Sequence, residues 1–201
     1  MTEDRRSRVD GARTRAVILR ESVAMATIDG LEGLSIGNLA KAAGMSKSGV
    51  YAHFGSKQDL QLATVEEAGR IFREEVVAPA LVAPAGVGQL VALCDAFCEH
   101  LRRRAFPGGC FFAGAALEMG TRPGPVKDRV AAFQGALMEL IRQFADTAIA
   151  QHELAADEKP ELVAFEVNGI ILAADTTYVL HDDPGVLEVA RHVIRRRLGV
   201  S

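Results

Sequence analysis

The chain lacks the patterns that place a protein in a membrane or outside the cell. Its 201 residues contain no uninterrupted apolar run of the roughly 18 residues that a membrane-spanning helix needs. Its start, MTEDRRSRVDGARTRA, has no apolar segment of the kind found in signal peptides. We therefore expect a cytoplasmic protein with no membrane association.

The sequence also lacks the patterns of common enzyme and metal sites. It has no glycine-rich phosphate loop after a strand, no nucleophile elbow and no zinc-spaced pair of ligands. We therefore expect no catalysis, no cofactor and no metal ion. Alternating strand patterns, internal repeats and low-complexity tracts are missing as well, and most of the chain follows a helical periodicity.

The composition allows a small domain followed by a larger one. Apolar residues make up 49% of the chain and charged residues 24%, so a sizeable core is expected. The first 60 residues hold nine basic and seven acidic side chains, a net charge of +2, whereas the rest hold fourteen and nineteen, a net charge of −5. The amino-terminal part is thus slightly more positive than the rest, as DNA binding there requires, although the difference is small.

A basic arm, expected to be flexible over about residues 1–10, precedes a first helix expected over about Gly11 to Ile28. Such an arm can contact phosphates or a minor groove, or it can be a solvated tail. The sequence leaves both readings open. The arginines concerned are Arg5, Arg6, Arg8, Arg13 and Arg15.

Residues 35–60 have the pattern of a helix-turn-helix followed by the start of a further helix. Ser35 precedes an apolar stripe at helical spacing, and a serine there can cap a helix by accepting a backbone N–H. Gly44 suits the tight turn that follows, because glycine tolerates a positive φ. Ser46 caps a second short helix, which Gly55 ends. This arrangement is typical of proteins that place a recognition helix in the major groove.

Four motifs stand in this stretch: Ser35-Ile36, Ala43-Gly44-Met45-Ser46, Val50-Tyr51-Ala52-His53-Phe54 and Ser56-Lys57-Gln58-Asp59-Leu60. They resemble the amino-terminal domain of the TetR/AcrR family of transcriptional regulators. Gln58 departs from the family pattern, which usually has an acid there, but Asp59 supplies a negative charge favourable to the helix dipole. The resemblance covers the first quarter to third of the chain.

The resemblance implies an all-α fold of about nine helices and a repressor function. It implies a helix-turn-helix DNA-binding domain over residues 1–56 and a larger ligand-binding and dimerisation domain over residues 57–201. In the larger part, the sequence predicts a helix that ends at Val77 because Pro79 follows. Further helices are expected over about 87–104, 110–119, 126–151, 161–180 and 184–198.

The recognition helix and its flanks carry the residues predicted to meet double-stranded DNA. Lys47 and Ser48 begin this helix, where side chains reach base edges, and Gly49 allows the backbone to come close. By resemblance, Tyr51, His53 and Lys57 contact phosphates, Lys57 with the help of its helix dipole. Tyr51 and His53 have packing as an alternative. The full predicted set is Ser35, Ser46, Lys47, Ser48, Gly49, Tyr51, His53 and Lys57.

The segment 161–180 is apolar around most of its circumference, which predicts burial on more than one side. A second subunit is the simplest second cover, and the resemblance implies a homodimer joined through the last two helices. Two-fold symmetry would place two recognition helices on a palindromic operator. The core helix of a monomer has the same pattern, and this alternative stays open. The predicted interface residues are Phe165, Gly169, Ile170, Ala173, Val189 and Val193.

The carboxy-terminal helices are predicted to enclose a pocket for a small hydrophobic or aromatic effector, whose binding releases the DNA. The predicted lining residues are Phe97, Cys98, Leu101, Phe111, Phe112, Phe133, Leu137 and Asn168. All of them could equally form solid core.

Two alternatives remain for the regulation: a regulator with no small-molecule ligand, or one with cysteine-based redox sensing. Cys110 follows Gly109 at an expected helix start, where the pKa of a thiol can be lowered. Cys94 and Cys98 share one helix face. Free cysteines more often behave as small buried apolar residues, which favours a packing role for all three.

Overall fold

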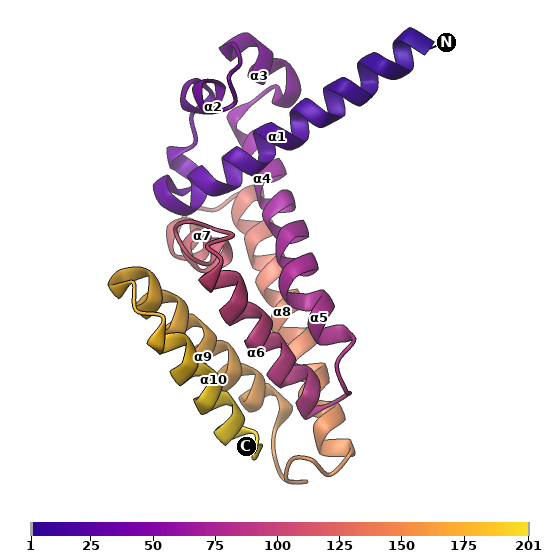
Figure 1. Cartoon of the computed structure of the whole chain (residues 1–201), viewed down its shortest axis with the longest axis vertical. Coiled ribbons are helices and arrows are strands. Elements are labelled where there is room, and N and C mark those ends of the chain that lie inside the picture. The colour runs from indigo at the N-terminus through magenta and orange to yellow at the C-terminus, as the bar shows by residue number, and fades with distance from the viewer. Residues whose placement is uncertain (1, 201) are drawn as a thin grey trace.

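The structure of the protein is a computed structural model that describes residues 2–200, with side chains described from residue 11 onward. Within this range every regular element is helical (Figure 1), which confirms the predicted all-α fold. Since α4, η1 and α5 follow one another without a break, the described chain forms nine helical rods. The elements are α1 (Thr2–Gly33), α2 (Ile36–Ala42), α3 (Lys47–Phe54), α4 (Lys57–Phe72), η1 (Arg73–Val77), α5 (Ala78–Leu81), α6 (Val87–Arg102), α7 (Phe111–Met119), α8 (Pro125–Ala150), α9 (Pro160–His181) and α10 (Gly185–Arg197).

Helices α1, α2 and α3 pack with the first turns of α4 into a small unit at one end of the molecule (Figure 1). Helices as short as α2 and α3 are not stable alone in water, so tertiary packing must hold them. A small apolar core does so, formed by Ile18, Leu19, Leu39, Ala40, Val50, Phe54 and Leu60.

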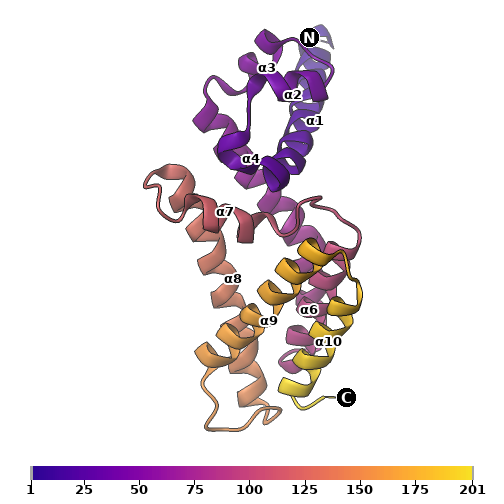
Figure 2. The same cartoon turned by 90° about the vertical axis from the view of Figure 1, so that its left-hand side faces the viewer.

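The remaining helices form an elongated bundle in which α9 contacts both α8 and α10 (Figure 2). The bundle encloses a second, larger core that extends from the end of α1 to α10. Val23, Ala26, Leu31 and Leu34 of the α1 segment belong to this larger core and not to the small one. Helix α1 is therefore shared by both units of the molecule.

The first helix begins earlier and ends later than the sequence predicts. We expected a flexible arm followed by a helix from about Gly11, whereas α1 starts at Thr2. Gly11 does not interrupt it, because one glycine lowers helix stability by only about 1 kcal/mol and the preceding arginines are good helix formers. A kink at Gly30, with φ 79° and ψ 165°, precedes a last turn that ends at Gly33. The side chains of Arg5, Arg6 and Arg8 lie outside the described residues.

The helix after residue 57 does not end before Pro79, contrary to the prediction. The π-helical segment η1 joins α4 to α5, which continues to Leu81. Proline breaks a regular helix because it lacks an N–H and its ring crowds the preceding turn. A π-turn is wider than an α-turn, so it accommodates Pro79 in the first turn of α5.

By length and composition, α9 is apolar enough to cross a membrane, a test that core helices of soluble bundles also pass. In the structure Val163, Val167 and Ile171 of α9 are buried against the neighbouring helices. Glu166 of the same helix forms an ion pair with Arg197 of α10. Helix α9 is thus an element of the bundle, with one apolar face left exposed.

Candidate nucleic-acid interface and apolar pocket

Two serines cap the helices of the helix-turn-helix. Ser35 Oγ accepts a hydrogen bond from the N–H of Asn38 at 3.0 Å, and Ser46 Oγ accepts one from the N–H of Gly49 at 3.1 Å. These bonds satisfy N–H groups that the first helical turn leaves free. Both serines therefore act as caps in the free protein, and any DNA contact by them would be additional.

The turns between these helices use glycine where the backbone requires it. Gly44 and Gly55 have φ values of 64° and 72°, the left-handed region that other residues adopt at a cost. Ser56 Oγ then accepts the N–H of Asp59 at 3.0 Å and starts α4. The predicted order of cap, turn, cap, turn and cap is confirmed.

Helix α3 has one buried and one exposed face. Val50 and Phe54 are buried in the small core, whereas Lys47, Ser48 and Tyr51 point outward. Tyr51 is 54% exposed, which is unusual for a tyrosine that serves only in packing. The outward face of α3 thus presents a cation and two hydroxyl groups to an approaching molecule.

Two further predicted contact residues are half-buried. The His53 ring lies 6.3 Å from the Phe54 ring, centroid to centroid, and so rests partly on the small core. Gly49 lies where a Cβ would stand 3.2 Å from Ser46 Oγ, so a larger residue would crowd the cap. His53 can donate a hydrogen bond from the edge of the exposed α3 face. Gly49 adds no side chain to that face, so the backbone there can be approached closely.

Lys57 is already engaged by the end of α1. Its Nζ donates to the backbone carbonyl of Glu32 at 2.7 Å and to the Glu32 carboxylate at 3.1 Å. Hydrogen bonds from Gln61 and Lys57 lower the pKa of Glu32, so the carboxylate stays ionised. The Lys57 side chain remains 47% exposed, which leaves donor capacity for a phosphate. A phosphate contact by Lys57 would therefore be sensitive to the position of α1.

A carboxylate from the larger domain holds the end of α1. In α7, the two Glu118 oxygens accept the N–H groups of Leu31 at 2.7 Å and Glu32 at 2.8 Å. These N–H groups follow the kink at Gly30, where a Cβ would stand 2.8 Å from the same carboxylate. Since charged acceptors form strong hydrogen bonds, Glu118 fixes the last turn of α1 against α7.

A pocket of about 480 Å³ lies between α4–η1, α6, α7, α8 and α9. Its walls are mostly apolar, and one wall is the Phe133 ring stacked on Phe112 with centroids 4.8 Å apart. Gly69 permits this packing, because a Cβ there would overlap the Phe133 ring. The lining residues are Phe72, Arg73, Val77, Phe97, Cys110, Phe112, Ala113, Phe133, Gln134, Ala136, Leu137, Met138, Leu140, Asn168, Ile171 and Leu172.

The structure brings five of the eight predicted pocket residues to this cavity: Phe97, Phe112, Phe133, Leu137 and Asn168. The other three point elsewhere. Phe111 precedes Phe112 by one position on the helix, a rotation of about 100°, and packs against Phe106 with ring centroids 6.2 Å apart. Leu101 is buried in the core near the end of α6.

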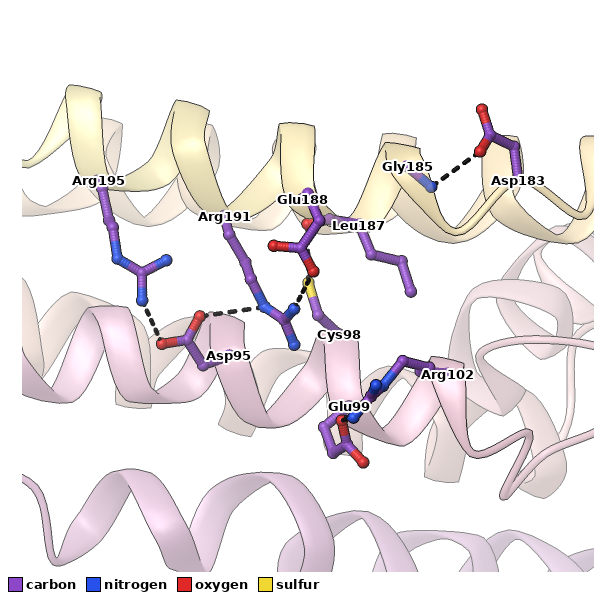
Figure 3. Close-up of polar contacts among 10 residues, drawn as sticks. All are labelled: Asp95, Cys98, Glu99, Arg102, Asp183, Gly185, Leu187, Glu188, Arg191 and Arg195. Atoms are coloured by element: carbon purple, nitrogen blue, oxygen red, sulfur yellow. Dashed lines mark hydrogen bonds and ion pairs between the residues drawn. The ribbon is translucent and has the colours of Figure 1, made fainter. Parts of the chain in front are cut away.

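Cys98 faces α10 and not the pocket. Its Sγ lies 3.7 Å from the Leu187 carbonyl oxygen, beside a row of ion pairs that joins α6 to α10 (Figure 3). In that row Asp95 of α6 meets Arg191 at 3.3 Å and Arg195 at 2.6 Å. The amphipathic pattern of α6 could not tell which neighbouring helix each of its apolar residues meets.

Arg73, the one charged residue that lines the pocket in the described part of the chain, was not predicted. In a helix, an arginine between a phenylalanine and two glutamates has the pattern of a solvated surface residue, which gives no indication of a pocket. The π-turn that begins at Arg73 could not be seen in the periodicity, and it is this segment that brings Arg73 and Val77 to the pocket.

Cys110 lies at the pocket wall, but its environment does not suit a redox sensor. Burial, together with the nearby Asp175 carboxylate, raises the pKa of its thiol to about 12. The Cys110 N–H donates to Asp175 Oδ1 at 2.8 Å. Cys94 and Cys98 are also buried. All three thiols are thus shielded from solvent, whereas the reactive form of cysteine is the exposed thiolate.

The predicted interface residues lie along one side of α9 and α10. Phe165 is 72% exposed, and Val189 and Val193 are exposed as well. Gly169 and Ala173 are exposed on α9, whereas Ile170 is half-buried against the core. Together with Leu162 and Leu180, they leave an apolar strip uncovered in the single chain.

Two family models match the chain. One, described as bacterial regulatory proteins of the tetR family, matches residues 18–64. The other, described as a tetracyclin repressor-like C-terminal domain, matches residues 86–194. No curated protein matches the chain.

Solved structures of similar shape are numerous. A TetR transcriptional regulator from Chloroflexus aurantiacus J-10-FL is 25% identical with a TM-score of 0.87, over 94% of this chain and 96% of that one. A TetR-family regulator from Streptomyces coelicolor is 23% identical with a TM-score of 0.80, over 94% and 95%. AibR, solved with isovaleryl coenzyme A and operator DNA, is 21% identical with a TM-score of 0.71, over 92% and 97%.

Proposed function

The chain belongs to the TetR family of bacterial regulatory proteins, and on that premise we propose that it is a cytoplasmic repressor released from DNA by a small molecule. It binds a palindromic operator as a homodimer. An effector with an apolar or aromatic body enters the pocket and favours a conformation in which the two recognition helices no longer match the operator.

The exposed face of α3 supports the DNA-binding part of the proposal. Lys47 and Ser48 stand at the start of the recognition helix, where side chains reach base edges in the major groove. Tyr51 and His53 lie further along it and donate to phosphates, which position the protein on the duplex. Lys57 reaches a phosphate from the start of α4.

The uncovered strip on α9 and α10 supports the homodimer. A large exposed apolar surface is rare in a monomeric soluble protein and marks a contact with another molecule. A two-fold axis through this strip would pack the α9–α10 pairs of two chains as four helices, with Phe165, Gly169, Ile170, Ala173, Val189 and Val193 at the contact.

The observation that carries effector control is the double role of α7. Phe112 and Ala113, at its start, line the pocket, while Glu118, one to two turns later, holds the end of α1. A ligand that moves α7 must either move α1 or break these hydrogen bonds. Such a ligand has different affinities for two states, which is the requirement for allosteric coupling.

Fluorescence anisotropy with the DNA fragment upstream of its own gene tests the DNA-binding part. We expect saturable binding that weakens as salt increases. Lys47→Ala should reduce the affinity by about tenfold, the effect of losing one base contact. Lys159→Ala, the same change of charge at the distant start of α9, is the control and should leave it unchanged. Equal affinity for unrelated DNA of the same length would refute operator recognition.

Sedimentation analysis tests the homodimer. The wild-type chain should sediment as a dimer at micromolar concentration, and Phe165→Arg should sediment as a folded monomer, because it places a charge in the apolar contact. A wild-type monomer at that concentration would contradict this part of the proposal.

A further inference from the structure

The charge in the effector pocket has one sign. Among the residues that the structure describes, Arg73 is the one charged side chain that lines the cavity, and no aspartate or glutamate lines it. The other polar lining groups, Gln134, Asn168 and the buried thiol of Cys110, are neutral. The pocket therefore offers an apolar interior with one cationic point.

Arg73 forms no ion pair with a described side chain, although its charge acts on the Glu66 carboxylate and helps to lower the pKa of that group. The larger domain has twelve arginines, and all but Arg73 and Arg196 form an ion pair within the described side chains. The acids near Arg73 are already taken: Glu66 is held by Arg129, and Glu74 by Arg70 at 2.6 Å. The Arg73 guanidinium is thus available to an external anion.

The guanidinium is nevertheless held at the pocket. Its central carbon lies 5.1 Å from the centre of the Phe133 ring, within the range of a cation–π contact. That ring is itself fixed by stacking on Phe112. The contact orients Arg73 without neutralising its charge, and the planar guanidinium keeps donors free for the two oxygens of a carboxylate or similar group.

A second donor lies near the same wall. Gln134 Nε2 donates to the Phe112 carbonyl at 3.3 Å, so the side chain is oriented by the α7 backbone. The Arg73, Phe112 and Gln134 groups belong to η1, α7 and α8, the helices that meet around the pocket. An anion at Arg73 would therefore lie beside the helix that reaches the end of α1.

We propose that the effector is an organic anion, with an aromatic or apolar body among the phenylalanines and one acidic group paired with Arg73. This inference rests on the proposed function, because it names the chemical class of the molecule that occupies the pocket. An uncharged molecule with the same body would bind more weakly, since it would form no charge-assisted contact with Arg73, whose side chain is exposed at the pocket wall.

Two dyes with the same rings provide the test. Anilinonaphthalene sulfonate carries an acidic group, and phenyl-naphthylamine is the same ring system without it. Both fluoresce in apolar surroundings, and the chain contains no tryptophan to interfere. In the full-length protein we expect one site per chain and an affinity about tenfold higher for the sulfonate, as one charge-assisted contact provides.

Arg73→Gln should abolish this preference by weakening the sulfonate about tenfold while leaving the neutral dye unchanged. Arg196→Gln removes the other unpaired arginine of the larger domain and should preserve the preference. Arg73→Lys should retain part of it, because the charge remains. The inference would be overturned if Arg73→Gln weakened the binding of both dyes equally, or if the wild type bound the two dyes with the same affinity.

A pocket-filling variant separates this inference from the proposed function. Leu137→Trp should block both dyes while melting as the wild type does. If both dyes bind equally well and Leu137→Trp blocks them, the pocket takes ligands but not by charge, and only the anion inference fails. If Leu137→Trp leaves the binding of both dyes unchanged, or if neither dye binds the wild type, then the pocket is not a ligand site. The proposed effector control and the anion inference would then both be wrong.

Discussion

The two units of the molecule are stabilised in different ways. The helix-turn-helix has a core of seven buried residues, and its helices are defined by caps three residues away in the sequence. The larger domain has a far larger core, and its pocket is formed by residues from five separate parts of the chain. The DNA-facing unit is therefore a local structure with few buried contacts to stabilise it, whereas the pocket depends on packing between distant parts of the chain. Helix α1 belongs to both, so substitutions within each unit measure how far the two are independent.

Removing the largest side chain of the small core should have the greatest effect. Phe54→Ala should destabilise the helix-turn-helix by about 3–5 kcal/mol, because the cavity cannot be filled by so few neighbours. DNA binding should be lost, while the neutral dye should still bind the pocket. Tyr51→Ala, on the exposed side of the same helix, should weaken DNA binding and change the melting temperature little. Loss of dye binding in Phe54→Ala would show that the two units fold as one.

The contact between the α6–α7 loop and α1 should be the next most sensitive. A Cβ at Gly108 would stand 1.8 Å from the backbone carbonyl oxygen of Thr27, so Gly108→Ala must push the two segments apart. We expect a loss of about 1–3 kcal/mol, as for other overpacked sites, measured by urea unfolding. Gly114→Ala in α7 has open space around its Cβ and should be neutral or stabilising by up to about 1 kcal/mol. Equal effects of the two substitutions would contradict this packing.

Loss of the Glu118 carboxylate should separate the units with a smaller loss of stability. Glu118→Ala leaves the buried N–H of Leu31 without its acceptor, at a cost of about 1–2 kcal/mol. The more informative readout is coupling: DNA affinity should respond less to pocket ligands than in the wild type. Glu118→Gln keeps one acceptor oxygen and should be intermediate. Full ligand response in Glu118→Ala would place the coupling elsewhere.

The smallest effect expected is a pH dependence that belongs to the larger domain. Burial lowers the pKa of His100, and this outweighs the opposite effect of its 2.7 Å contact with Glu75. Its Nε2 is buried with no hydrogen-bond partner among the described side chains, so a proton there would lie unpaired beside the ring of Phe106. In the unfolded chain the histidine pKa is about 6.5, so that at slightly acidic pH the unfolded state binds a proton at this residue and the folded state does not.

Stability from His100 should therefore be present above about pH 6.5 and decrease as the pH falls below it. His100→Gln should remove this component, and the difference between the two unfolding curves from pH 7 to pH 5 isolates it from the carboxylates. If the wild type instead gained stability relative to His100→Gln as the pH fell, the folded protein would bind the proton more tightly than the unfolded chain does.

The sequence predicted the DNA-facing unit well because its signals are local. Ser35, Ser46 and Ser56 make the predicted caps, and each bond spans three residues. The contact between Lys57 and Glu32 was not predicted, because it depends on where α1 ends relative to α4. The kink at Gly30 that places Glu32 there has no periodic signal.

The pocket was predicted less completely for a physical reason. Consecutive residues on a helix point about 100° apart, so Phe111 and Phe112 look alike in the sequence but face different neighbours. Which of them lines a cavity depends on how α7 is rotated against α8. In the same way Pro79 predicted a helix end, whereas the π-turn beside it continued the helix and brought Arg73 to the pocket.

Ligand-controlled DNA release is tested most directly by the affinity of the pocket for a dye, measured in the free protein and in the protein saturated with its upstream DNA. Because coupling between two sites is reciprocal, a ligand that releases DNA must bind more weakly when DNA is bound, by the same factor. We expect a loss of about fivefold or more, the lower end of typical couplings, and the same factor when DNA affinity is measured with the pocket full. Equal dye affinities with and without DNA, at one dye per chain, would contradict it.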